Sequence, residues 1–247
     1  MSKFWQFKNQ VGGKTGELLI YGYIESTKWY DDDVTPKEFK KDLDALGDID
    51  TLNIYINSGG GDVFAAQAIY SMLNRHKAQK TTYVDGLAAS AASVIAMVGD
   101  KRIMPNNAML MIHKAWSIAV GNANDFRKRA DDLEKIEESI ISVYQEKSGL
   151  EREKIIELMT AETWMTAKEA KDYGFIDEID EEKEVAACLD GCFLSINGQK
   201  TDLSRYRNPP KMFVSPPEKP TAKLDETQFL ALESAVNIKK SKYQEVT

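Results

Sequence analysis

The sequence is poor in the residues that bind metals and form disulfides. Only two cysteines and two histidines occur among its 247 residues. Cys188 and Cys192 are spaced C-x-x-x-C with no histidine nearby, whereas a structural zinc ion needs about four ligands. We therefore expect no metal site and, in a reducing cytosol, no disulfide. Both cysteines are interpreted as small apolar residues.

Long apolar runs and an excess of positive charge are also missing. No stretch approaches the ~18 consecutive apolar residues of a transmembrane helix, and the first ten residues lack the apolar centre of a signal peptide. The formal net charge is −7, whereas nucleic-acid-binding proteins usually present a basic face. We predict a cytoplasmic protein that binds neither membranes nor nucleic acid.

Proline is scarce except near the end of the sequence. Five of the seven prolines fall between Pro209 and Pro220, and such a stretch cannot sustain a helix or a central strand. We therefore predict three parts: a folded domain over residues 1–190, an extended proline-rich linker over 191–222, and a helical or disordered tail over 223–247.

Apolar residues in the first 180 positions alternate between strand-like and helical spacing. Strands are predicted over residues 18–24, 52–56, 81–86, 102–104, 108–112 and 175–179. Helices are predicted over residues 34–46, 65–74, 90–98, 124–147, 151–159 and 166–173. Such alternation is typical of an α/β domain with a largely parallel sheet. The long helix over 124–147 has one apolar stripe, so it either lies on its own core or packs against another subunit.

The two histidines have different settings. His76 lies in a polar helix end and is most simply a solvated residue. His113 follows an apolar strand, and the carboxyl ends of parallel strands line the functional crevice of α/β sheets. His113 is therefore the candidate for chemistry.

Ser90 opens a predicted helix of small residues directly after a strand. A serine in that place is ordinarily a helix N-cap. The same placement also exposes the hydroxyl beside free backbone N–H groups, which can stabilise an oxyanion. The spacing therefore allows both a capping and a nucleophilic role.

A second strand-to-helix turn, residues 57–62, contains three consecutive glycines that permit unusual backbone angles. It lacks the Lys-Ser/Thr of a phosphate-binding P-loop and does not match G-x-G-x-x-G. Its amides can instead point into a site. Two such turns together with a histidine at a strand end are a stronger signal than the glycines alone.

Several segments resemble motifs of the ClpP peptidases, in the family's order and over roughly residues 17–182. They are residues 57–61 (NSGGG, for N-S-P-G-G), 86–92 (GLAASAA, for G-x-A-A-S-x-G), 111–113 (MIH), 164–170 (WMTAKEA, for F-L-S-A-x-E-A) and 173–177 (YGFID, for Y-G-L-V-D). Gly59 replaces the family's proline, and Ala92 replaces its glycine. The resemblance implies a ClpP/crotonase-like spiral of ββα units with a protruding handle helix, at 124–147, and assembly into a homo-oligomeric ring.

The resemblance also implies the site. Ser90 matches the nucleophile and His113 the general base, and the amides of Gly61 and Ala91 match the oxyanion donors. Glu162 stands where the family usually has the aspartate of the triad, and a glutamate can also orient the imidazole. The implied activity is serine endopeptidase hydrolysis of protein or peptide substrates through an acyl-enzyme. It requires no metal or organic cofactor.

Residues 24–34 resemble the corresponding segment of phage and prophage ClpP-related head-maturation proteases. This implies capsid or scaffold proteins as substrates, in the host cytoplasm or inside a procapsid. A contact surface for an unfoldase ATPase cannot be read from the sequence. Two alternatives remain: a non-catalytic assembly protein with the ClpP fold, and a crotonase-type acyl-CoA enzyme with a similar amide oxyanion site.

Overall fold

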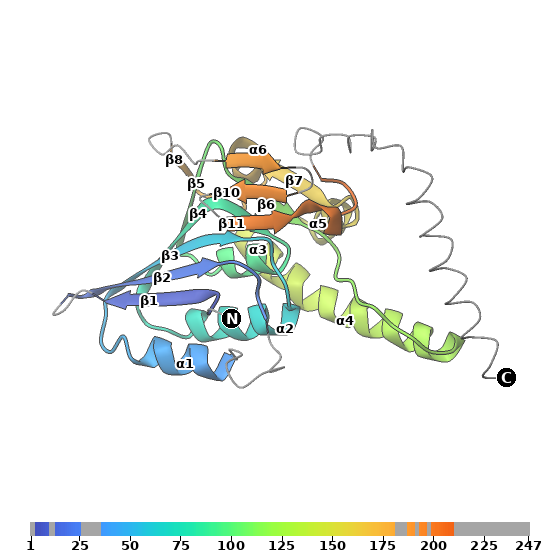
Figure 1. The fold of residues 1–247 in the computed structure, drawn as a ribbon, viewed down its shortest axis with the longest axis horizontal. Helices are drawn as coiled ribbons and strands as arrows, with labels where there is room; N and C mark the ends of the chain where they lie inside the picture. Colours follow the sequence, from blue (N-terminus) through green and yellow to red (C-terminus); the bar gives the residue numbers. More distant parts are fainter. Residues whose placement is uncertain are drawn as a thin grey trace, which may run out of the picture. The chain divides into compact units, whose positions relative to one another are not determined.

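The structure, a computed structural model, describes residues 3–9, 13–25, 36–180, 187–190, 193–196 and 199–209. In this part of the chain strands and helices alternate in a mixed α/β arrangement (Figure 1). No helix within these ranges combines the length and the apolar character needed to cross a lipid bilayer. The proline-rich residues 210–222 and the tail 223–247 lie outside the described residues.

One eight-stranded sheet organises the described residues, in the order β1-β2-β3-β4-β5-β8 with β6 and β7 branching from β4. Its strands are β1 (Trp5–Asn9), β2 (Thr15–Tyr21), β3 (Thr51–Ser58), β4 (Gln79–Ala89), β5 (Lys101–Pro105), β6 (Met109–Ile112), β7 (Thr163–Thr166) and β8 (Glu178–Asp180). The pairs from β2 through β5 to β8 are parallel. The β1–β2 and β6–β7 pairs are antiparallel.

The branch in the sheet lies on β4. Its residues 81–83 pair with β5, whereas its last residues, 87–89, pair in parallel with β6. The carboxyl ends of β4 and β6 therefore lie side by side. Ser90 directly follows β4 and His113 directly follows β6, so the branch brings the two residues to the same edge of the sheet.

Within the described ranges six helices flank the sheet: α1 (Pro36–Asp44), α2 (Val63–Asn74), α3 (Ala91–Ala96), α4 (Ala123–Ser148), α5 (Arg152–Thr160) and α6 (Ala167–Asp172). Helices α1 and α2 lie along one face of β1 to β3 (Figure 1). Their apolar sides, including Phe39 and Leu73, are fully buried against sheet residues such as Ile54 and Ile56. This burial supplies the main core and explains the helical spacing read from the sequence.

Helix α4 is divided along its length. Residues 121–131 are exposed, and the first buried residue of the helix is Glu137, followed by Ile140, Ile141 and Tyr144. The helix therefore packs on its own core through its second half, while its first half projects beyond the sheet (Figure 1).

A small antiparallel sheet follows, formed by β9 (Ala187–Asp190), β10 (Phe193–Ile196) and β11 (Gln199–Asp202), with a 3-10 turn at Leu203–Arg205. Leu194 and Leu203 pack with Leu87, Ala89 and Met111 in a separate apolar cluster. Neighbouring Ala88 belongs to the main core, and successive strand residues point to opposite faces. The small sheet therefore covers the second face of the large one.

This small sheet corrects one expectation. The sequence predicts an extended linker from residue 191, but residues 193–196 and 199–205 form regular structure. The local composition favours a linker, but apolar residues such as Leu194 and Leu203 stabilise regular structure here. They do so because they cover an apolar face of the large sheet that water would otherwise contact. The three-part division of the chain as a whole stays a prediction.

Candidate active site

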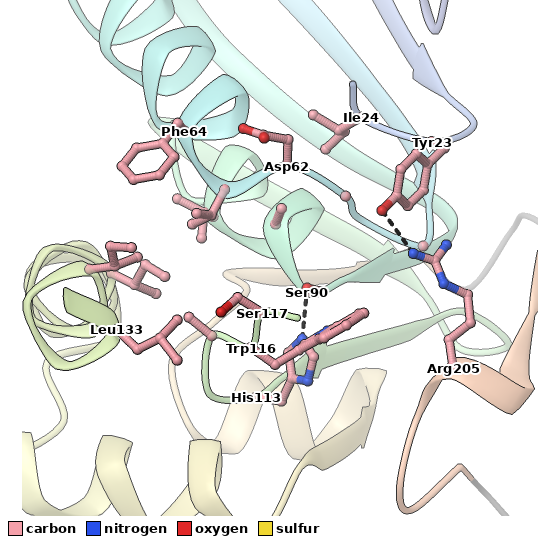
Figure 2. Close-up of a pocket in the computed structure, with 18 of the residues that line it drawn as sticks. Tyr23, Ile24, Asp62, Phe64, Ser90, His113, Trp116, Ser117, Leu133 and Arg205 are labelled. Atoms are coloured by element: carbon pink, nitrogen blue, oxygen red, sulfur yellow. Dashed lines mark hydrogen bonds between the residues drawn. The ribbon is translucent and has the colours of Figure 1, made fainter. Parts of the chain in front are cut away.

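Ser90 occupies a strained turn between β4 and α3. Its backbone angles are φ 54° and ψ −127°, and its side chain makes no capping hydrogen bond to α3. A positive φ is costly for a residue with a Cβ, so the surrounding structure must impose it. The hydroxyl instead lies 2.8 Å from Nε2 of His113 (Figure 2). The capping role that the sequence allowed is thus not the one this side chain performs.

Neighbouring elements hold the backbone of this turn on both sides. The amide of Ser90 donates to the carbonyl of Met111 in β6 at 2.9 Å. The carbonyl of Ser90 accepts from the hydroxyl of Ser93 at 2.5 Å, and Oγ of Ser93 lies 2.8 Å from the buried hydroxyl of Tyr144 in α4. The turn at Ser90 is therefore tied to both β6 and the buried half of α4.

His113 is set up to accept a proton. Its side chain is 12% exposed, and this burial lowers the pKa of His113 below its ordinary value. The negative charge of Glu162 opposes that decrease in pKa, and the positive charge of Arg207 adds to it. A neutral imidazole at neutral pH can accept the proton of the Ser90 hydroxyl.

Glu162 lies on the other side of His113, with Oε2 3.8 Å from Nδ1 of the imidazole. This is longer than a hydrogen bond, but contacts between catalytic groups commonly tighten when substrate binds. The carboxylate is buried at 6% exposure, and its backbone φ is 50°. Its two oxygens accept hydrogen bonds from the amides of Arg207 and Asn208.

The glycine turn lies directly against the nucleophile turn. A Cβ on Gly60 would lie 2.6 Å from the carbonyl oxygen of Ala89 and 2.7 Å from Cβ of Ser90, and one on Gly61 would lie 2.1 Å from the carbonyl oxygen of Ile24. Both glycines also have positive φ. Only glycine fits these two positions. Ala91 is the first residue of α3, where a backbone N–H has no acceptor within its own helix.

The Ser90–His113 pair opens into a cavity of about 600 Å³. Figure 2 shows Phe64 and Leu133 on one side of the pair and Tyr23 and Arg205 on the other. The wall formed by α3 and α4 is mainly apolar: Val94, Leu133, Ile136 and Ile140 line it, together with the charged Arg129 of α4. The opposite wall is polar, and there Arg205 donates to the hydroxyl of Tyr23 at 2.8 Å. The cavity can therefore receive an apolar group beside the serine hydroxyl.

Four of the five residues that the sequence predicted for the site line this cavity: Ser90, His113, Gly61 and Ala91. The fifth, Glu162, lies beside His113. His76 lies elsewhere, and its Nδ1 accepts a hydrogen bond from the amide of Ala78. Cys188 lies in β9, and Cys192 is outside the described residues.

Sequence reasoning missed Tyr206, Arg207 and Asn208. Their stretch of sequence contains no known motif and precedes a proline run, so composition alone assigned it to a linker.

A serine on a strained strand-to-helix turn, paired with a buried histidine and backed by a carboxylate, is the arrangement of a serine hydrolase. Comparisons with known proteins agree. The family described as Clp protease matches residues 35–183. The proteolytic subunit of ATP-dependent Clp protease from Bacteroides fragilis is 34% identical over 153 residues, covering 60% of this chain and 74% of that protein.

Two further relatives carry the same description. The proteolytic subunit from Deinococcus radiodurans is 34% identical over 139 residues, covering 56% of this chain and 68% of that protein. The subunit from Bacteroides thetaiotaomicron is 33% identical over 153 residues, covering 60% and 70%. This chain belongs to the Clp protease family. It is a serine peptidase with the family's mixed α/β fold, which confirms the fold class and the enzyme class predicted from the sequence.

Proposed function

We propose that Ser90, His113 and Glu162 form the catalytic triad of an endopeptidase. The observation that carries this assignment is the 2.8 Å contact between Oγ of Ser90 and Nε2 of His113, both of which line the cavity. His113 takes the proton of Ser90 as the hydroxyl attacks a peptide carbonyl, and Glu162 stabilises the imidazolium that forms. His113 gives that proton to the leaving amine as the C–N bond breaks, and the acyl-enzyme that remains is hydrolysed by water that the neutral His113 activates.

The amides of Gly61 and Ala91 hold the oxyanion in this proposal. Both residues line the cavity beside Ser90. Donors of this kind typically lower the barrier by about 3–4 kcal/mol each, because they are already oriented toward the developing charge. The apolar wall of the cavity accommodates an apolar side chain on the acyl side of the cleaved bond. No metal or organic cofactor enters the mechanism.

Labelling with a fluorophosphonate probe tests this assignment. The probe should modify Ser90, as located by peptide mass spectrometry, and the His113→Ala variant should lose the labelling because the hydroxyl loses its base. His76→Ala is the matched control, since it removes the other histidine of the chain, and should label as the wild type does. An assembled wild-type protein that remains unlabelled would favour the non-catalytic assembly role.

Assembly into a homo-oligomeric ring is part of the proposal. The exposed half of α4 and the loop before it carry large apolar side chains: Trp116 is 55% exposed, Ile118 83%, Val120 97% and Phe126 50%. Such a concentration of exposed apolar groups favours a protein interface. Multi-angle light scattering should give a mass well above the 27.8 kDa of one chain, and a monomer would contradict the ring.

The substrate in the cell is proposed from the sequence resemblance alone. Residues 24–34 favour processing of phage capsid or scaffold proteins, in the host cytoplasm or inside a procapsid. Most of that segment lies outside the described residues, and the relatives above are named as subunits of an ATP-dependent protease. Co-expression with candidate capsid proteins, with Ser90→Ala as control, should yield fragments that mass spectrometry assigns. A dependence on an ATPase partner would appear as cleavage of folded substrates only when the ATPase is added.

A further inference from the structure

The carboxylate of Glu162 is held mainly by a segment that follows the small sheet. The amide of Arg207 donates to Oε2 at 3.0 Å, and the amide of Asn208 donates to Oε1 at 2.7 Å. The other hydrogen bond to this carboxylate within the described residues is the longer one from the Trp164 indole, at 3.4 Å. A buried carboxylate needs donors of this kind to remain charged. The two amides therefore fix the position of the carboxylate beside His113.

The same segment also contacts the glycine turn. The hydroxyl of Tyr206 donates to the carbonyl of Gly59 at 2.5 Å, and the Tyr206 ring lies edge-on to the rings of Trp164 and His113. A Cβ on Gly59 would lie 2.8 Å from Cγ2 of Thr201 in β11. One short stretch of chain thus touches the acid, the base and the turn that carries Gly61.

The segment is firmly attached to the large sheet. Leu203 is 1% exposed and packs in the cluster of Leu87 and Ala89 at the end of β4, one residue before Ser90. Asp202 caps the 3-10 turn by accepting from the amide of Ser204. The side-chain amide of Asn208 donates to the carbonyl of Ala161. These contacts give Arg207 and Asn208 a fixed backbone position relative to Glu162.

The contacts coincide with departures from the family's motifs. Gly59 replaces a proline and Glu162 replaces an aspartate, and both contact residues 201–208, which lie beyond the family match over 35–183. We propose that residues 203–208 belong to the active site, and that the amides of Arg207 and Asn208 position Glu162 to orient His113. This inference rests on the proposed function, since it assumes that Glu162 is the orienting acid.

Two substitutions test the positioning role from opposite sides of the contact. Asn208→Pro removes one amide donor, whereas Asn208→Ala keeps that amide and loses only the side-chain hydrogen bond to the carbonyl of Ala161. Glu162→Asp leaves residues 203–208 unchanged but withdraws the carboxylate from the amides by one methylene. Asn208→Pro and Glu162→Asp should each lower kcat about tenfold on a fluorogenic peptide, with KM changed less than about twofold, because misplacing a catalytic group impairs the chemical step. Asn208→Ala should lower kcat less than Asn208→Pro does, because it keeps the amide that donates to Glu162.

A double-mutant cycle separates positioning from general stability. If residues 203–208 act through Glu162, then Asn208→Pro should cause no further loss of kcat in a Glu162→Ala background. Equal losses in both backgrounds would overturn the proposal. Should Asn208→Pro unfold the protein, the Glu162→Asp variant decides. Full activity in that variant would show that residues 203–208 do not position the acid. Activity above that of the wild type would show that these residues restrain the acid instead of serving it. Either result would overturn the proposal.

Hydrogen exchange gives a readout that does not depend on turnover. The amides of Arg207 and Asn208 should exchange faster in Glu162→Ala than in the wild type, because they lose their acceptor. Unchanged exchange would overturn the inference while leaving the proposed function intact. A wild type that the fluorophosphonate probe cannot label, with exchange changed as expected, would instead reject the proposed function.

Discussion

Ser90 and Glu162 share a positive φ but are held in place by different parts of the chain. Ser90 and Glu162 are the two non-glycine residues with positive φ in the described part of the chain. Ser90 is held by Met111 of β6 and, through Ser93, by Tyr144 of α4. The side chain of Glu162 is held by amides beyond the family match.

Each such backbone conformation costs about 1–3 kcal/mol and persists only where neighbouring contacts impose it. The turn at the proposed nucleophile is therefore held by the body of the domain, whereas the side chain of the proposed acid is held by an addition to it. Four predictions test this difference, ordered by expected effect.

Removing the proposed nucleophile should cost far more activity than removing the proposed acid. Ser90→Ala should lower kcat on the order of 10⁶-fold, because no covalent intermediate can form. Glu162→Ala should lower kcat about a thousandfold, because the imidazole loses its orienting charge but remains a base. Both variants are compared by steady-state kinetics at matched assembly state. Similar losses for the two would contradict the assigned roles.

Gly60→Ala should distort the nucleophile turn directly. The new Cβ would meet the carbonyl of Ala89 and Cβ of Ser90 at under 3 Å, so kcat should fall about a hundredfold through misplacement of Ser90. Gly47→Ala is the matched control: its φ is also positive, at 68°, but its Cβ would meet nothing within 4 Å. It should lose about 1–2 kcal/mol of stability and retain kcat. A fully active Gly60→Ala would show that the turn tolerates displacement.

Truncating one leucine in each of the two apolar clusters should separate an effect on stability from an effect on the position of Glu162. Leu203→Ala opens the small cluster under residues 203–208, whereas Leu73→Ala opens the main core. Leucine-to-alanine changes of this kind cost about 2–5 kcal/mol. Leu203→Ala should lower kcat severalfold in the folded enzyme, while Leu73→Ala should lower only the melting temperature. An unchanged kcat in Leu203→Ala would mean that the acid does not depend on this anchoring.

The smallest expected effect is on the pH profile. Arg207 lowers the pKa of His113 and Glu162 raises it. Because the base must be neutral, activity is lost as the pH falls through the pKa of His113. Arg207→Gln raises that pKa and should shift the acid limb of kcat/KM to higher pH, whereas Glu162→Gln lowers it and should shift the residual activity to lower pH. Shifts in the same direction would contradict these charge effects.

Local sequence patterns predicted most of the large sheet and all six of its helices to within a few residues. Two edge strands, β1 and β7, were missed. Trp5–Asn9 mixes polar and apolar residues, and Thr163–Thr166 is short. Both become strands through pairing with β2 and β6. Pairing of this kind depends on residues distant in sequence and leaves little local signal.

The sequence by itself determined the class of enzyme, a serine peptidase, and the residues proposed for its site. Ser90, His113 and the glycine turn are local motifs, because a strained turn requires small residues within a few positions of the nucleophile. Tertiary structure alone decided what holds Glu162. Arg207 and Asn208 contribute backbone amides rather than side chains, and every residue except proline carries such an amide. A contact of that kind has no residue signature and exists only when the chain folds back on itself.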